Sequence, residues 1–236
     1  MDRASVLQIY DDQYAAVYNE CFLLGDDFRE CTSYESSLLR SQIDESTSWL
    51  DVACGTGYFL SLFPRIVRCG LDIAPAMLKL ARTANPGAHF VEGDYRSDFP
   101  EWRDQWSLVS CMWYAYSYAG SIWDVERVFG NLAAWTAPGG SCFVPLCDPD
   151  VLAKTQIPHR PPADSTDGEL EVTAIIWNWT DLPFGKQHKG LIAPHTEHIL
   201  GIFRPLFSDV SVHVYPAFER DCLTSRKAIL AKGKLA

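Results

Sequence analysis

The sequence predicts an α/β fold in which a mostly parallel sheet carries helices on both faces. From Trp49 onward, short apolar runs alternate with segments of helical periodicity. Parallel strands need a crossover, which is usually a helix, so this alternation favours βαβ units. The expected strands of the series lie at residues 49–52, 66–71, 89–91, 108–112 and 142–146.

The helices between these strands have their own start and stop signals. A short apolar helix is expected over residues 58–63, directly after the first strand. Pro75 occupies the position that proline favours at the start of a helix. Ser121 and Asp124 resemble a capping box, and the helix that they begin ends at residues 138–140, which read Pro-Gly-Gly.

Four regions are expected along the chain. They are an N-terminal helical lid (1–48), the core of the fold (49–147), a loop with an antiparallel hairpin (148–194), and a helix with the last two strands (195–236). The lid carries tyrosines at the spacing of one helix face, namely Tyr10, Tyr14 and Tyr18. A second helix of the lid is expected over 34–43, the hairpin over 169–179 and 188–192, the last helix over 195–203, and the last strands over 210–215 and 227–231.

Composition and charge exclude several classes of protein. A chain of 236 residues with 47% hydrophobic and 21% charged residues is typical of a globular domain. A net charge of −10 opposes binding to nucleic acid, since that affinity comes largely from cations that neutralise phosphates. Apolar runs are shorter than the roughly 18 residues of a membrane span, and no signal peptide is recognisable, so we expect a cytoplasmic protein without membrane contacts.

The cysteines and histidines do not form a recognisable metal site. Eight cysteines include no Cys-x-x-Cys pair, which predicts neither a disulfide framework nor zinc. His195 and His198 have a spacing that suits a metal, but no third ligand with convincing spacing accompanies them, so we expect no metal. One of His188, His195 and His198 could instead act as a base, or these histidines could serve only as capping or solvated residues.

A glycine turn follows the first strand, in the motif LDVACGTGYF. Gly55 and Gly57 would let a ligand approach the backbone closely, and the start of the next helix presents unpaired N–H groups. Asp51, at the end of the strand, could accept hydrogen bonds from those amides or from a ligand ammonium group. Asp72 in GLDI and Asp94 in EGDY end the next two strands, so three acids are expected at one edge of the sheet.

These motifs resemble those of the class I S-adenosylmethionine-dependent methyltransferases, over residues 49–146. The resemblance implies a Rossmann-like sheet of seven strands whose last strand is antiparallel. It also implies S-adenosylmethionine as cofactor and S-adenosylhomocysteine as product. The segments YDDQY and CMW resemble small-molecule enzymes of natural-product biosynthesis, including amino-sugar N-methyltransferases.

The resemblance also implies roles for individual residues. The cofactor would be bound by Asp51, Ala53, Gly55 and Gly57 at its methionine part, by Asp72 at the ribose hydroxyls, by Ile73 and Met77 on either side of the adenine, and by Asp94 and Tyr95 at the adenine amino edge. Ala53 stands where the family commonly has glycine.

We therefore expect methyl transfer to a nitrogen or oxygen of a small organic metabolite, with nitrogen favoured. Related amino-sugar enzymes often have a histidine after the CM pair, where this chain has tyrosines. Tyr118 and then Tyr14 are the candidate catalytic residues beside His195. The candidate acceptor-binding residues are Tyr10, Trp113, Tyr116 and Trp177. Trp177 and Trp179 would share one face of the hairpin, where they stack an acceptor or form a homodimer contact.

Two other functions remain open from the sequence. A non-catalytic partner subunit that binds S-adenosylmethionine is suggested by the missing histidine. A nicotinamide-dependent oxidoreductase would also have a glycine turn between strand and helix. However, Leu60 stands at the third glycine of that G-x-G-x-x-G pattern.

Overall fold

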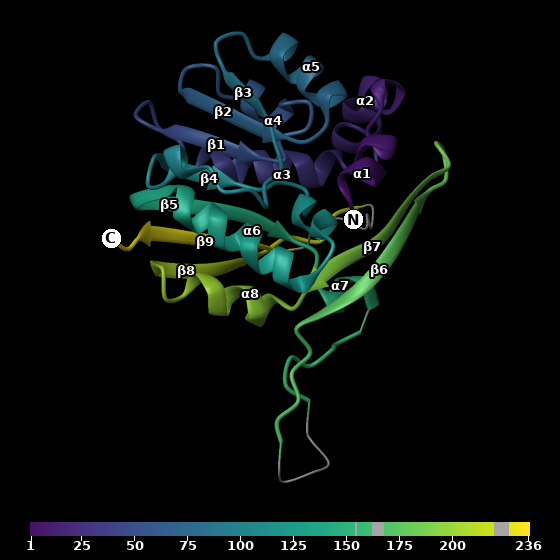
Figure 1. Cartoon of the computed structure of the whole chain (residues 1–236), viewed down its shortest axis with the longest axis vertical. Coiled ribbons are helices and arrows are strands. Elements are labelled where there is room, and N and C mark those ends of the chain that lie inside the picture. Colours follow the sequence, from purple (N-terminus) through teal and green to yellow (C-terminus); the bar gives the residue numbers. More distant parts are fainter. Residues whose placement is uncertain (154, 162–167, 220–226) are drawn as a thin grey trace.

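A computed structural model describes residues 1–153, 155–161, 168–219 and 227–236. Its main sheet has seven strands in the order β3-β2-β1-β4-β5-β9-β8 (Figure 1). Their bounds are β1 Ser48–Val52, β2 Val67–Asp72, β3 His89–Glu92, β4 Trp106–Ser110, β5 Thr136–Leu146, β8 Phe207–Val214 and β9 Lys227–Lys234.

The strands β3, β2, β1, β4 and β5 pair with one another in parallel. The strand β9 is antiparallel to both β5 and β8. The predicted seven-stranded, mostly parallel sheet with an antiparallel last strand is confirmed. The chain leaves β1 towards β2 on one side, whereas β4 pairs with β1 on the other. Open α/β sheets bind ligands at the carboxyl ends of the strands beside such a reversal.

Helices cover both faces of the sheet because strand side chains alternate between them. Leu50 and Val109 pack with α6 (Ile122–Trp135) and α8 (Thr196–Phe203). Their neighbours Trp49 and Leu108 belong to a second apolar cluster on α3 (Arg29–Arg40), α4 (Tyr58–Ser61) and α5 (Pro75–Ala84). Short 3₁₀ helices lie at η2 (Pro100–Trp102) and η3 (Ala115–Ala119).

The first residues form two helices where the tyrosine spacing predicted one, so that expectation was wrong. α1 (Arg3–Ile9) ends before Tyr10, and α2 (Asp12–Tyr18) continues into the π-helix η1 (Asn19–Leu23). The break has a local cause, since the Asp11 carboxylate accepts a 2.9 Å hydrogen bond from the backbone N–H of Tyr14 and caps α2. The tyrosines nevertheless remain neighbours, with 5.6 Å between the ring centroids of Tyr10 and Tyr14.

The predicted hairpin is a separate two-stranded antiparallel sheet of β6 (Ala174–Asp181) and β7 (Lys186–Pro194). It extends along one side of the main sheet, and its tip lies beside α2 (Figure 1). The short helix α7 (Pro149–Ala153) occupies part of the expected loop before it.

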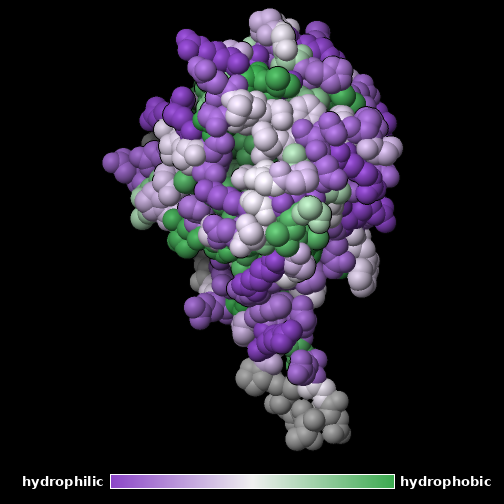
Figure 2. All heavy atoms as spheres, turned by 90° about the vertical axis from the view of Figure 1, so that its left-hand side faces the viewer, coloured by the Kyte–Doolittle hydropathy of each residue, from purple (hydrophilic) through white to green (hydrophobic). Residues whose placement is uncertain are grey.

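The side of the molecule away from the hairpin is mostly hydrophilic, with small hydrophobic patches between charged residues (Figure 2). None of the helices in the described part of the chain combines the length and apolar character that crossing a membrane requires.

Candidate active site

A cavity of about 360 Å³ lies at the carboxyl ends of β1, β2 and β4. Three parts of the chain enclose it: the strand ends with the glycine turn, the helices of the lid, and the inner face of the hairpin. Its volume lies within the range of small-molecule sites.

Asp51 presents one carboxylate oxygen without a partner at this cavity. Its Oδ1 accepts a 2.6 Å hydrogen bond from the hydroxyl of Ser110, which in turn accepts a 2.8 Å bond from the Trp49 indole. Oδ2 is buried and has no hydrogen-bond partner among the described residues. Burial raises the pKa of Asp51 to about 7, against the effect of the Ser110 hydrogen bond. A buried carboxylate with one unpartnered oxygen and a raised pKa is suited to binding a cationic group of a ligand.

The glycine turn is held in a left-handed backbone conformation. Ala53, Gly55 and Gly57 have φ angles of 56°, 55° and 69°. A Cβ atom on Gly57 would lie 2.7 Å from the Asn85 amide nitrogen, which donates a 3.0 Å hydrogen bond to the Gly57 carbonyl. A Cβ atom on Gly55, which lines the cavity, would meet no atom within 4 Å. Gly57 therefore serves packing, whereas Gly55 leaves room for a ligand.

Asp72 joins the end of β2 to the glycine turn. Its two carboxylate oxygens accept hydrogen bonds from the backbone N–H groups of Gly55 (2.7 Å) and Ala74 (2.8 Å). Burial raises the pKa of Asp72 despite these bonds. A carboxylate offers about four acceptor positions, so two remain for hydroxyl groups of a ligand. The side chains of Ile73 and Met77 line the cavity beside it.

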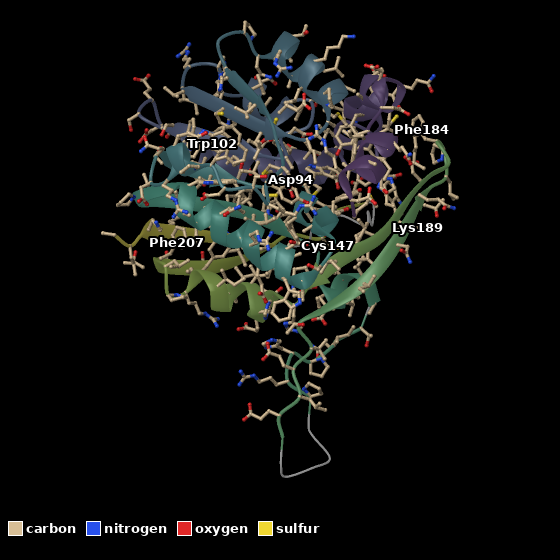
Figure 3. The ribbon with its side chains drawn as sticks, viewed as in Figure 1. Asp94, Trp102, Cys147, Phe184, Lys189 and Phe207 are labelled. Carbon is tan, nitrogen blue, oxygen red and sulfur yellow. The ribbon has the colours of Figure 1, made fainter. Side chains whose placement is uncertain are left out.

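Asp94 lies just beyond β3, near the middle of the view in Figure 3, and is paired with Arg96. The Arg96 guanidinium donates to both carboxylate oxygens, and the Arg96 backbone N–H donates to Oδ1. Burial alone would raise the pKa of Asp94, but the hydrogen bonds from Arg96 hold it below its usual value. Little acceptor capacity is left for the adenine amino group that the resemblance implied. Tyr95 donates its hydroxyl to the Ala115 carbonyl at 3.2 Å.

Phenols and one imidazole form a connected group on the opposite wall. Tyr10 donates a 3.1 Å hydrogen bond to the Tyr118 hydroxyl, which lies 2.5 Å from Nδ1 of His188 on β7. Tyr14 instead donates to the buried carboxylate of Asp181, at 3.0 Å. Burial lowers the pKa of His188 to about 4, so this imidazole is neutral near pH 7.

Comparison with known proteins identifies the fold. Residues 50–140 match a family model described as a methyltransferase domain, which spans the three acids of the cavity. Over these residues the chain is similar in sequence to methyltransferase domains. Asp51, Asp72 and Asp94, which line the cavity, all lie within the matched residues.

Curated relatives of this methyltransferase domain act on amino sugars. The chain is 30% identical over 144 residues to the dTDP-4-amino-2,3,4,6-tetradeoxy-D-glucose N,N-dimethyltransferase of Saccharopolyspora spinosa, covering 60% of this chain and 57% of the relative. It is 33% identical over 149 residues to the dTDP-3-amino-3,4,6-trideoxy-alpha-D-glucopyranose N,N-dimethyltransferase of Streptomyces venezuelae, covering 61% and 62%. The chain thus spans less than two thirds of the length of these relatives.

Solved methyltransferase structures share the fold at lower identity. S-adenosylmethionine-bound CalS10, an amino pentose methyltransferase from Micromonospora echinaspora, superimposes with a TM-score of 0.61 at 21% identity, covering 94% of this chain and 97% of that one. The complex of DhpI with S-adenosylhomocysteine gives a TM-score of 0.62 at 16% identity, covering 98% and 97%.

The structure brings most of the predicted site residues to one cavity. The residues that line it are Asp51, Ala53, Gly55, Asp72, Ile73, Met77, Asp94, Tyr95, Tyr10, Tyr14, Tyr118, Trp113 and Trp177. Trp179 also lines it, so the two hairpin tryptophans do share one face. Gly57, which was predicted to line the methionine part of the cofactor, is not among the lining residues: it lies behind the turn, against α5.

Two predicted residues lie elsewhere, and these assignments are corrected. Tyr116 is buried beneath the cavity, where its hydroxyl accepts a 3.0 Å hydrogen bond from the Cys147 backbone and its ring packs on Phe129. His195 caps the N-terminus of α8 and stacks on His159, with 4.7 Å between ring centroids. His188, one of the three histidines considered as a base from the sequence, is the one beside the cavity wall, next to the Tyr118 hydroxyl.

A second cluster of polar residues lies at the base of the insertion, outside the cavity. His159, Glu171 and His198 hold their ligand atoms within 4.8 Å of one another. Glu171 is the third partner that spacing along the sequence did not reveal. Each histidine already has a carboxylate at 2.9 Å, His159 with Glu171 and His198 with Glu126. The cluster therefore ties this segment to α8 and α6 through hydrogen bonds between imidazole and carboxylate groups.

Proposed function

We propose that this protein transfers a methyl group from S-adenosylmethionine to a nitrogen atom of a small organic molecule. The observation that carries the proposal is the unpartnered Asp51 oxygen beside the glycine turn. A carboxylate there suits the ammonium group of a methionine moiety, and the open space at Gly55 suits a ligand close to the backbone.

The residues of the cavity fit the cofactor. Asp51 would hold the ammonium group, and the two remaining acceptor positions of Asp72 would hold the ribose hydroxyls. Ile73 and Met77 offer apolar surface for the adenine ring. When bound, the cofactor supplies an electrophilic methyl group on its sulfonium sulfur. The tasks left to this chain are to align the acceptor with that methyl group and to exclude water.

The aromatic character of the acceptor side favours nitrogen over oxygen. The rings that line this part of the cavity are Tyr10, Tyr14, Tyr18, Phe22, Phe28, Trp113, Tyr114, Tyr118, Trp177 and Trp179. Methylation of an amine produces an ammonium ion, which aromatic faces stabilise by about 0.5–2 kcal/mol each. Three of the curated relatives are N,N-dimethyltransferases, which supports the same choice, whereas a fourth, which matches over 68 residues, is a trans-aconitate 2-methyltransferase.

The charges around the cavity favour an amine without phosphate groups. Asp27, Asp51, Asp72 and Asp94 line it. Two described cationic groups also line it: the Arg96 side chain, which is paired with Asp94, and the Met1 terminal ammonium, which donates to the Tyr118 carbonyl oxygen. With Asp94 paired to Arg96, three carboxyl groups and the Met1 ammonium group remain, and this balance favours a cationic or neutral amine over a diphosphate. We therefore extend the relatives' N-methylation to this chain, but not their nucleotide-linked sugars.

Calorimetric titration with S-adenosylmethionine, S-adenosylhomocysteine and NAD tests the cofactor. We expect binding of both S-adenosyl ligands and none of NAD, with Asp51→Asn weakening the former. Transfer of labelled methyl groups to a panel of amines, matched alcohols and dTDP-amino sugars then tests the acceptor. Transfer to the alcohols or nucleotide sugars alone would contradict the proposal. Cofactor binding without transfer to any acceptor would favour a non-catalytic subunit instead.

A further inference from the structure

Tyr118 is the central member of a hydrogen-bonded chain of three residues from three distant segments. Tyr10 comes from the junction of α1 and α2, Tyr118 from η3, and His188 from β7. Tyr10 and Tyr118 line the cavity, whereas His188 is buried behind them against Trp179, with 4.5 Å between the two ring centroids.

The direction of these hydrogen bonds follows from the groups involved. Tyr10 donates to the Tyr118 oxygen at 3.1 Å. A neutral imidazole has one acceptor nitrogen, and it is a better acceptor than a phenol oxygen, whereas a phenol is the better donor. Tyr118 therefore gives its only hydrogen to Nδ1 of His188, over 2.5 Å. The imidazole hydrogen then resides on Nε2, which is buried without a partner among the described residues.

This arrangement leaves the Tyr118 oxygen with one lone pair and no hydrogen to offer the cavity. We propose that this oxygen accepts a hydrogen bond from an N–H group of the methyl acceptor, and that His188 is the positioning residue that makes it an acceptor. The inference rests on the proposed N-methyltransferase function and names the group by which the amine is held.

The geometry has a direct consequence for methyl transfer. An amine attacks through its nitrogen lone pair, so a hydrogen-bond donor at this wall would occupy the electrons that the reaction needs. An acceptor instead binds an N–H and leaves the lone pair free to point at the methyl group. Tyr118 oriented by His188 thus selects a reactive orientation of an amine.

Two organic cations of the same shape test this role without knowledge of the natural acceptor. N,N-dimethylbenzylammonium carries one N–H, and benzyltrimethylammonium has a methyl group in its place. Both are titrated into protein saturated with S-adenosylhomocysteine. We expect the wild-type protein to bind the N–H probe about 10- to 100-fold more tightly, as for a hydrogen bond to a charged group.

Substitutions then assign the preference to the two residues. Tyr118→Phe removes the acceptor oxygen and should abolish the preference for the N–H probe. His188→Leu frees the phenol hydrogen to turn into the cavity, so it should weaken the preference. His188→Gln keeps an acceptor oxygen and should retain part of it. Tyr116→Phe is the matched control, because Tyr116 lies on the same 3₁₀ helix but outside the cavity, and it should leave the preference unchanged.

The tautomer of His188 gives a readout that does not depend on the variants. Nitrogen-15 chemical shifts of the imidazole should show the hydrogen on Nε2 at pH 7. A hydrogen on Nδ1, or an unchanged probe preference in Tyr118→Phe, would overturn the inference. Failure of S-adenosylhomocysteine to bind the wild-type protein would instead contradict the proposed function, so the two failures are distinguishable.

Discussion

Asp51 and Ser110 lie opposite each other at the ends of the parallel strands β1 and β4, joined by a 2.6 Å hydrogen bond. The bond crosses the point where the strand order reverses, so the packing of the sheet itself orients the carboxylate. Ser110 occupies one oxygen of Asp51 and leaves the other for a ligand. The most important polar group of the cavity is thus positioned by a residue that does not line it.

Binding of S-adenosylmethionine should depend on pH through Asp51. The pKa of Asp51 in the free protein is about 7, and a bound ammonium group would favour the ionised carboxylate and lower that pKa. Below pH 7 the ligand must therefore displace a proton, so its affinity should fall by up to about tenfold per pH unit. Calorimetry between pH 5.5 and 8.5, in buffers of different ionisation enthalpy, would measure the proton release.

The matched variant for this prediction is Asp51→Asn, which keeps an oxygen to accept the Ser110 hydroxyl but cannot ionise. It should bind S-adenosylmethionine more weakly and with no pH dependence over this range. A flat profile in the wild-type protein would show that Asp51 does not contact the ammonium group.

The two glycines of the turn should respond differently to alanine. Gly57→Ala places a Cβ atom 2.7 Å from the Asn85 amide nitrogen at a φ of 69°, which should lower the free energy of unfolding by roughly 1–3 kcal/mol. Gly55→Ala has the same backbone strain without the clash, so its effect on stability should be smaller. Because Gly55 lines the cavity, the Gly55→Ala variant should have a reduced affinity for the cofactor. Urea unfolding measures the stability of both variants, and titration measures their affinity for the cofactor. Equal losses of stability in the two variants would contradict this prediction.

Ala53 has a φ of 56°, a conformation that costs an L-residue about 1–2 kcal/mol. Ala53→Gly removes this strain but increases the flexibility of the unfolded chain, which costs about 0.5–1 kcal/mol. We therefore expect a net gain of up to about 1.5 kcal/mol in the free energy of unfolding. Urea denaturation provides the value, and a loss of stability would mean that the Ala53 methyl group makes packing contacts that outweigh the strain.

Glu35 should make the protein less stable at alkaline pH. It is buried in α3, and burial raises its pKa to about 8, against hydrogen bonds from Tyr215 and Cys31. The folded state thus holds a proton that the unfolded state, with an ordinary pKa near 4.5, releases. The stabilisation from this proton is complete below pH 4.5. It is lost as the pH rises from 4.5 through 8, at about 1.4 kcal/mol per pH unit.

Glu35→Gln keeps the shape and hydrogen-bonding capacity of the neutral acid without the titration. Its free energy of unfolding should decline less between pH 5 and 8 than that of the wild-type protein. Chemical denaturation at a series of pH values makes the comparison. Parallel profiles for the two proteins would mean that Glu35 is ionised in the folded state.

Much of the fold could be predicted because its signals are local. The apolar runs at Trp49 and Leu108 and the proline at the start of α5 mark elements whose bounds agree with the structure to within a few residues. The single helix expected at the N-terminus was wrong because the Asp11 cap interrupts it, although the tyrosine spacing continued across the break. Periodicity indicates which face of a segment is apolar, but it does not indicate where the backbone hydrogen bonds of one helix end and those of the next begin.

The sequence by itself determined the α/β fold, the glycine turn and the acids at the strand ends, because residues next to one another in the chain produce them. Only the tertiary structure decided which side chains complete the acceptor wall. It buried Tyr116, placed His195 at a helix cap, and brought His188 within 2.5 Å of Tyr118 from 70 residues away. Such contacts depend on how the hairpin packs over the lid, and that packing is set by long-range apolar and ionic contacts, such as Lys186 with Asp11.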